Sequence, residues 1–252
     1  MPDTFTPYGA THWTVLAVIV IGAVLLVLLG RRIRDTHAGA VFSRGFAVVL
    51  IGWALAMQVH RMLPGNWDVA SSLPLHFSDL TWMTAAYTLW TQRRWSFALT
   101  YYWGLTLNPQ AMLTPALDAP DFPDLAFIDF WVLHTLAVWA AVFLTWGLGM
   151  RPDWRSVATA VTATVAWGLG LLGFNALAGT NYGFVHRRAG EPVPARPAGR
   201  LALVPGRRAR PRHHRVGPDH VAVDEARKSG GHRVPASLPW RRPRFDRREV
   251  NP

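Results

Sequence analysis

Residues 1–186 are organised as long apolar stretches separated by short polar segments. Each stretch holds roughly 20 mostly apolar residues, the length that an α-helix needs to cross the hydrocarbon core of a bilayer. The pattern predicts about six transmembrane helices, near residues 12–30, 40–58, 73–91, 96–116, 128–149 and 157–178. We therefore expect an all-α fold, a polytopic membrane helix bundle.

The polar segments between these stretches alternate in charge. One set is acidic and carries Asp68 with a single Arg61, then Asp118, Asp121 and Asp124. The other set is basic and contains Arg31, Arg32, Arg34, Arg93, Arg94, Arg151 and Arg155. Because basic loops stay on the cytoplasmic side, the pattern predicts a multi-pass protein with an extracytoplasmic N-terminus.

The composition changes abruptly at residue 187. Residues 1–186 contain nine Arg and nine Asp with no Lys or Glu, so their net charge is zero. Residues 187–252 contain 16 Arg, one Lys, three Asp and three Glu, which accounts for the whole formal charge of +11. This second part is rich in Arg, Pro, Gly and Ala and shows neither a helical nor a strand period, so we predict a disordered basic tail.

Two interpretations of the tail are open. In the first, it is a basic tether for nucleic acid or anionic lipid. In the second, residues 187–252 are a frameshifted or non-native C-terminus, because a GC-rich gene read out of frame yields an Arg- and Pro-rich stretch with almost no Lys. We favour the second interpretation, and we expect membrane lipids as partners and no nucleic acid.

Ionisable side chains inside predicted spans are costly and usually face a bundle interior or a wet cavity. His76 and Asp79 are three residues apart at the start of the third span, so they share a helical face and are expected to pair. Ser78 lies about 200° round the helix from His76, so a base for its hydroxyl must come from another helix. His134, in the outer half of the fifth span, is the candidate base.

Further polar residues are predicted to gather in the same half of the bundle. Thr106, Gln110 and Thr114 recur at four-residue steps and form one polar stripe on the fourth span. The complete predicted cluster around Ser78 and His134 consists of His76, Asp79, Asn108, Gln110, Asn175, Asn181 and Tyr182. Three interpretations are open: a structural hydrogen-bond network, a Ser/His acyl-transfer site with Asn108 or Gln110 as oxyanion donors, and a substrate or proton path.

The chain contains no Cys. This excludes disulfides, thiolate catalysis and Cys-ligated metal clusters, and we expect neither a metal nor a cofactor. Gly168, Gly170 and Gly173 spell the GxGxxG pattern of a dinucleotide site, but no strand precedes them and they lie inside an apolar span. We interpret them as small residues that let two helices pack closely.

Four short motifs occur in a characteristic order: LPLHFSD at residues 73–79, YYWG at 101–104, QAMLTP at 110–115 and GTNYGF at 179–184. On these motifs the chain resembles the YwaF-like bacterial integral membrane proteins, over roughly residues 8–186. The resemblance implies a location in the bacterial plasma (inner) membrane. It also implies a seventh helix after the last motif, which this chain lacks.

The YwaF-like family is distantly similar to eukaryotic transmembrane acyltransferases that act on ether phospholipids. The resemblance implies that Ser78 occupies the nucleophile position and His134 the histidine position. Other members carry Cys where this chain has Ser78, and a Ser needs stronger activation than a Cys. We expect a lipid acyltransferase or hydrolase with an intramembrane Ser/His site. The alternative is a non-enzymatic membrane protein, a small transporter or a scaffold, whose polar cluster is structural.

Overall fold

The computed structural model describes residues 4–184. The predicted basic tail at 187–252 and the position of the seventh helix lie outside the described residues. Within them the chain is helical, and an isolated bridge between Thr4 and Pro120 is the one β-type contact in this part of the chain. The predicted all-α fold is confirmed.

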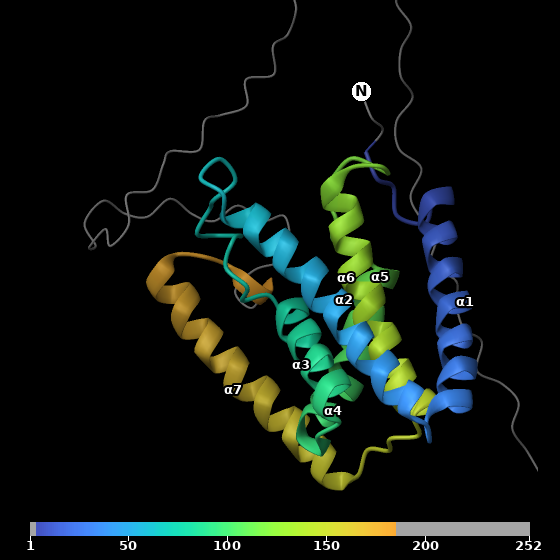
Figure 1. Ribbon diagram of the computed structural model, residues 1–252. Coiled ribbons are helices and arrows are strands. Elements are labelled where there is room, and N and C mark those ends of the chain that lie inside the picture. The colour runs from blue at the N-terminus through green and yellow to red at the C-terminus, as the bar shows by residue number, and fades with distance from the viewer. Residues whose placement is uncertain (1–3, 185–252) are drawn as a thin grey trace, which may run out of the picture. The chain divides into compact units, whose positions relative to one another are not determined.

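The helices follow one another with short connections (Figure 1). They are α1 (Ala10–Ile33), α2 (His37–Met62), α3 (Phe77–Thr91), α4 (Arg94–Tyr102), the π-helix η1 (Trp103–Leu107), α5 (Asn108–Leu113), α6 (Leu125–Val142), the π-helix η2 (Phe143–Gly147), α7 (Trp154–Ala178) and the 3₁₀ turn η3 (Tyr182–Phe184).

All six predicted apolar segments are helical, but they are not equally long. Among the described residues four segments are long and apolar enough to cross a membrane: α1, α2, α6 with η2, and α7. The third predicted segment begins late, at Phe77 rather than residue 73, and has 15 residues. At about 1.5 Å per residue it is roughly 22 Å long, shorter than a hydrocarbon core of about 30 Å.

The late start of α3 has a local cause. Pro74 disfavours helical backbone at the residue before it, and the segment between α2 and α3 forms turns instead. The fourth segment is interrupted differently, because η1 precedes Pro109 and separates α4 from α5. A π-turn absorbs a local irregularity without ending a helix, so α4, η1 and α5 continue one another.

The helices pack around a central core. Figure 1 shows α1 and α7 at opposite edges, with α2, α3, α4 and α6 between them. α1 contacts α6 and η2, whereas α7 contacts mainly α4. The core contains buried apolar side chains from α2, α3, α4 and η2, among them Phe46, Leu50, Leu89, Phe97, Phe143 and Leu144.

Close helix packing through glycine occurs, but not where it was predicted. A Cβ added to Gly30 would lie 2.6 Å from Cα of Gly147, so these two glycines bring α1 against η2. A Cβ on Gly168, Gly170 or Gly173 would meet nothing within 4 Å. The prediction of close packing through the GxGxxG glycines is therefore wrong for the described part of the chain.

Candidate functional site

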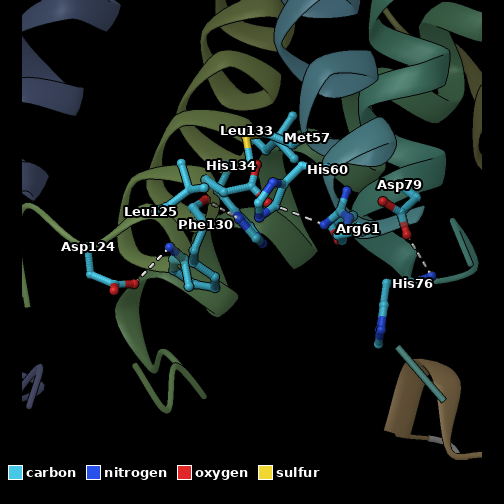
Figure 2. A pocket seen from close by; sticks show the side chains of 13 residues that line it. Met57, His60, Arg61, His76, Asp79, Asp124, Leu125, Phe130, Leu133 and His134 are labelled. Atoms are coloured by element: carbon cyan, nitrogen blue, oxygen red, sulfur yellow. Dashed lines mark hydrogen bonds and ion pairs between the residues drawn. The ribbon is translucent and has the colours of Figure 1, made fainter. Parts of the chain in front are cut away.

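A cavity of about 520 Å³ opens between α2, the start of α3 and the first half of α6 (Figure 2). We call it the α2–α3–α6 cavity. Four of the predicted site residues line it together: His76, Ser78, Asp79 and His134. The other lining residues are Met57, His60, Arg61, Asp124, Leu125, Ala126, Asp129, Phe130 and Leu133.

Ser78 and His134 lie at the same depth in the bundle. Ser78 lies thirteen residues before the last residue of α3, and His134 lies thirteen residues before Gly147, the last residue of η2. The next turns, at Gln92 and Gly149, line one cavity at the opposite end, so the two helical segments end at one level. At about 1.5 Å per residue, both side chains are roughly 20 Å from that end.

The hydrogen bonding of His134 determines its tautomer. Nδ1 lies 2.7 Å from the carbonyl oxygen of Phe130, one helical turn earlier. Because a carbonyl oxygen only accepts, Nδ1 carries the proton and Nε2 of the neutral ring is an acceptor. The ring also contacts that of Phe130, with 4.3 Å between the centroids. His134 therefore presents a proton-accepting nitrogen in a side chain that lines the cavity.

His76 and Asp79 do not pair through their side chains as predicted. The backbone N–H of His76 donates to Oδ2 of Asp79 at 2.9 Å, so the carboxylate caps the first turn of α3. Figure 2 shows the imidazole of His76 pointing away from that carboxylate. The ring lies instead against Tyr182, with 5.0 Å between the centroids. The three-residue spacing was read as a helical pair, but His76 precedes the helix.

The first turn of α3 leaves polar groups beside Ser78. Phe77 and Ser78 are the first two residues of the helix, and their N–H groups have no intrahelical acceptor. The helix dipole adds a partial positive charge at this end. Among the described residues the Ser78 hydroxyl makes no hydrogen bond.

An ion pair, missed in the sequence, crosses the cavity wall. Arg61 Nη1 lies 3.3 Å from Oδ2 of Asp129, which joins α2 to α6. Trp53 Nε1 donates to the other oxygen of Asp129 at 3.2 Å, and Arg61 Nη2 donates to Gln58 at 3.4 Å. The signal was present in the sequence: Arg61 is the single basic residue among the acidic connections, and Asp129 lies inside an apolar stretch.

Two further ionisable groups at the cavity have structural partners. Asp124 is the N-cap of α6 and accepts from the N–H of Ala126 at 2.8 Å. His60 Nε2 lies 3.2 Å from the amide nitrogen of Asn66, which donates to it.

Asn175 and Tyr182 do not line the cavity and are instead hydrogen-bonded to each other. Asn175 Oδ1 accepts from the N–H of Tyr182 at 2.9 Å and from Thr180 at 2.7 Å, and its Nδ2 donates to the carbonyl of Tyr182 at 2.9 Å. The Tyr182 hydroxyl donates to the carbonyl of Val69 at 2.8 Å and accepts from Leu73 N–H at 2.9 Å. Burial raises the pKa of this hydroxyl, which stays neutral.

The remaining predicted residues lie elsewhere. Asn181 does not line the cavity. Asn108 is buried, but its Nδ2 has no hydrogen-bond partner among the described residues. Gln110 is exposed, as are Thr106 and Thr114, so the predicted polar stripe exists but faces away from the bundle. Neither Asn108 nor Gln110 lines the cavity that contains Ser78, so the structure gives no support to the prediction that they donate to an oxyanion there.

Comparison with known proteins gives one result. The model of the TMEM164 family, a family of membrane proteins, matches residues 7–204. No curated protein and no solved structure matches the chain.

Proposed function

The chain belongs to the TMEM164 family, and we propose that the α2–α3–α6 cavity is the active site of a membrane-embedded enzyme that hydrolyses or transfers an acyl group of a lipid. Ser78 is the nucleophile and His134 is the general base. The observation that carries the proposal is that both residues line one cavity and that His134, with its proton on Nδ1, has Nε2 as an acceptor.

The proposed reaction follows ordinary acyl-transfer chemistry. His134 Nε2 takes the proton from the Ser78 hydroxyl while Oγ forms a bond to the carbonyl carbon of the lipid ester. The carbonyl electron pair moves onto oxygen, and it returns as the bond to the leaving alcohol breaks. That alcohol receives the proton from His134. Water, in hydrolysis, or the hydroxyl of a second lipid, in transfer, then removes the acyl group from Ser78.

The start of α3 supplies what stabilises the oxyanion. The N–H groups of Phe77 and Ser78 are free of intrahelical acceptors, and donors of this kind contribute about 3–4 kcal/mol each to a transition state. They replace Asn108 and Gln110 in this role. The carbonyl of Phe130 holds the imidazole in the required tautomer, which is the task a third residue performs in a catalytic triad.

The alternative function is non-enzymatic, a small transporter or a scaffold. The ion pair between Arg61 and Asp129 supports it, because interhelical hydrogen bonds and ion pairs also hold membrane bundles together. In that case the free Ser78 hydroxyl has no chemical role, and its removal leaves every reactivity of the protein unchanged.

Labelling with a fluorophosphonate probe, which reacts with activated serines, separates the two functions. We expect labelling of the wild type and of Ser71→Ala, whose serine is exposed and does not line the cavity, and loss of labelling in Ser78→Ala. Equal labelling of Ser78→Ala and Ser71→Ala contradicts the enzyme proposal. Because the chain has no Cys, Ser78→Cys introduces a single thiol, and its alkylation by a soluble maleimide shows whether position 78 is accessible.

We further propose that the protein lies in a bacterial inner membrane with its N-terminus outside, as a YwaF-like member of the family. The basic turns support this orientation, because Arg31–Arg34, Arg93–Arg94 and Arg151–Arg155 follow alternate helices and so fall at one end of the bundle. Ser71→Cys should then react with a membrane-impermeant maleimide in intact cells and Arg93→Cys should not. The reverse result contradicts the orientation.

A further inference from the structure

A second cavity lies at the opposite end of the bundle, where α3 turns into α4 and η2 connects to α7. Its volume is about 390 Å³, and its polar lining consists of Gln92, Arg94, Arg151, Asp153 and Ser156. We call it the arginine cavity. A third guanidinium lies at its wall, since a Cβ on Gly149 would be 3.6 Å from Nη1 of Arg34.

The lining of this cavity carries more positive than negative charge, with Arg94 and Arg151 against Asp153. Arg94 and Arg151 form no ion pair within residues 4–184, and Arg34 pairs with the exposed Asp35 at 3.1 Å. Asp153 is the one acid in the lining, and its Oδ1 accepts from both the N–H and the hydroxyl of Ser156 at 2.8 Å. The lining therefore holds two guanidinium groups against one carboxylate, and Arg94 attracts that carboxylate without forming an ion pair with it. One positive charge is left over for another anion.

The surrounding backbone favours an anion as well. α4 begins at Arg94 and α7 at Trp154, so the N-terminal ends of two helices lie at the same cavity. Helix N-termini carry partial positive charge and free N–H groups. These ends add to the field of the two guanidinium groups rather than opposing it.

We propose that the arginine cavity binds a phosphate group. Guanidinium groups bind phosphate oxygens through paired N–H donors, and the cavity lies at the helix ends, where lipid headgroups are found. The group comes either from an anionic phospholipid or from soluble phosphate. This binding is independent of the proposed chemistry at Ser78, since the two cavities share no lining residue.

The simplest objection is that these arginines only set membrane orientation. Arg32 and Arg93 provide the matched control, because both are exposed at the same end of the bundle and neither lines the cavity. A double variant Arg32→Gln/Arg93→Gln removes the same charge as Arg94→Gln/Arg151→Gln. It also keeps residues 187–252, with their 16 Arg, so nonspecific attraction by that segment is equal in the two proteins.

The test uses the full chain in neutral detergent and follows the thermal unfolding midpoint against added ligand. The probes are inorganic phosphate, with chloride at equal ionic strength as reference, and phosphatidylglycerol, with phosphatidylcholine as reference. We expect at least a 10-fold weaker apparent affinity for one probe in Arg94→Gln/Arg151→Gln than in the control variant. A response to phosphatidylglycerol alone identifies a lipid headgroup, and a response to both identifies any phosphate group.

Equal affinities in the two double variants overturn the proposal, as does a wild type that responds to neither probe. If Arg94→Gln/Arg151→Gln does not fold, Arg94→Lys and Arg151→Lys replace it. Each keeps its charge but loses the paired donors, so an affinity unchanged from wild type in both lysine variants also overturns the proposal.

Discussion

Two histidines in this protein, the buried His12 and the half-buried His134, differ in how completely their ring nitrogens are bonded. His12, on α1, is fully buried. Its Nδ1 accepts a hydrogen bond from the N–H of Tyr8 at 2.8 Å, and its Nε2 donates one to the carbonyl oxygen of Met112 at 2.8 Å. His134 has one such bond, to its own helix at Phe130, and its other nitrogen belongs to a cavity-lining side chain.

The difference separates structural polar groups from chemical ones. His12 ties the N-terminal segment to the end of α5 and lies among aromatic rings, with 5.3 Å between its centroid and that of Trp131. Asn175 is bonded just as completely, through both atoms of its amide. A polar group whose partners all come from the fold holds that fold together. One that keeps a free atom at a cavity has capacity for a substrate.

The largest expected effect distinguishes the two histidines. His134→Ala should slow fluorophosphonate labelling of Ser78 by about 10²–10⁴-fold, because the general base is lost. His12→Ala should leave the labelling rate of the folded protein unchanged. It should instead lower the free energy of unfolding by about 1–3 kcal/mol for each buried group that it leaves unpaired. Labelling rates and thermal unfolding midpoints, measured on the same preparations, check both.

If His134→Ala labels as fast as the wild type, His134 is not the base and the comparison fails. His134→Gln sharpens the result. Glutamine can still donate to a neighbouring carbonyl but is not basic. Labelling of Ser78 in this variant should therefore remain slow even if its thermal unfolding midpoint returns to that of the wild type.

Sequence patterns predicted much of this molecule. Apolar stretches of about 20 residues located all six helical segments, and polar side chains inside those stretches located Ser78, His134, His76 and Asp79, which the structure brings to one cavity. These succeeded because a polar group at membrane depth is costly and must face something polar. The family match supports the membrane assignment.

The predictions that failed were those that depended on which way a helix faces, on the residue at which a helix begins, or on contacts between distant parts of the chain. Gln110 lies three residues beyond η1, which has both buried and exposed positions, and nothing in its spacing shows which way it faces. The His76–Asp79 spacing implied a side-chain pair only if both residues were helical, but α3 begins at Phe77. Gly30 and Gly147 approach each other across 117 positions of sequence, which no local pattern reports.

A smaller effect is expected at Asn175, which sequence reasoning placed in the site. Asn175→Ala should lower the free energy of unfolding by about 1–3 kcal/mol, because buried partners at Thr180 and Tyr182 lose their acceptor. Labelling at Ser78 should persist in the folded protein. Leu169→Ala, an exposed position on the same helix, is the control and should change the midpoint little. Loss of labelling without loss of stability would assign Asn175 to the site after all.

The smallest effect is expected at Asp153, the N-cap of α7. Like Asn175 it is hydrogen-bonded within the protein, but it is exposed to solvent. Hydrogen bonds from the hydroxyl and N–H of Ser156 hold the pKa of its carboxyl below the ordinary value. Because the pKa is lower in the folded state, ionised Asp153 stabilises the protein above the unfolded pKa of about 3.9, and this contribution is lost as the pH falls through the folded value. Asn is an equally good helix cap but does not titrate, so the stability of Asp153→Asn should lack this pH dependence.

The measurement is the thermal unfolding midpoint at pH 6 and pH 3, in buffers without phosphate. The midpoint of the wild type should exceed that of Asp153→Asn by more at pH 6 than at pH 3. A difference that is the same at both pH values would mean that the carboxylate contributes no more than a neutral cap.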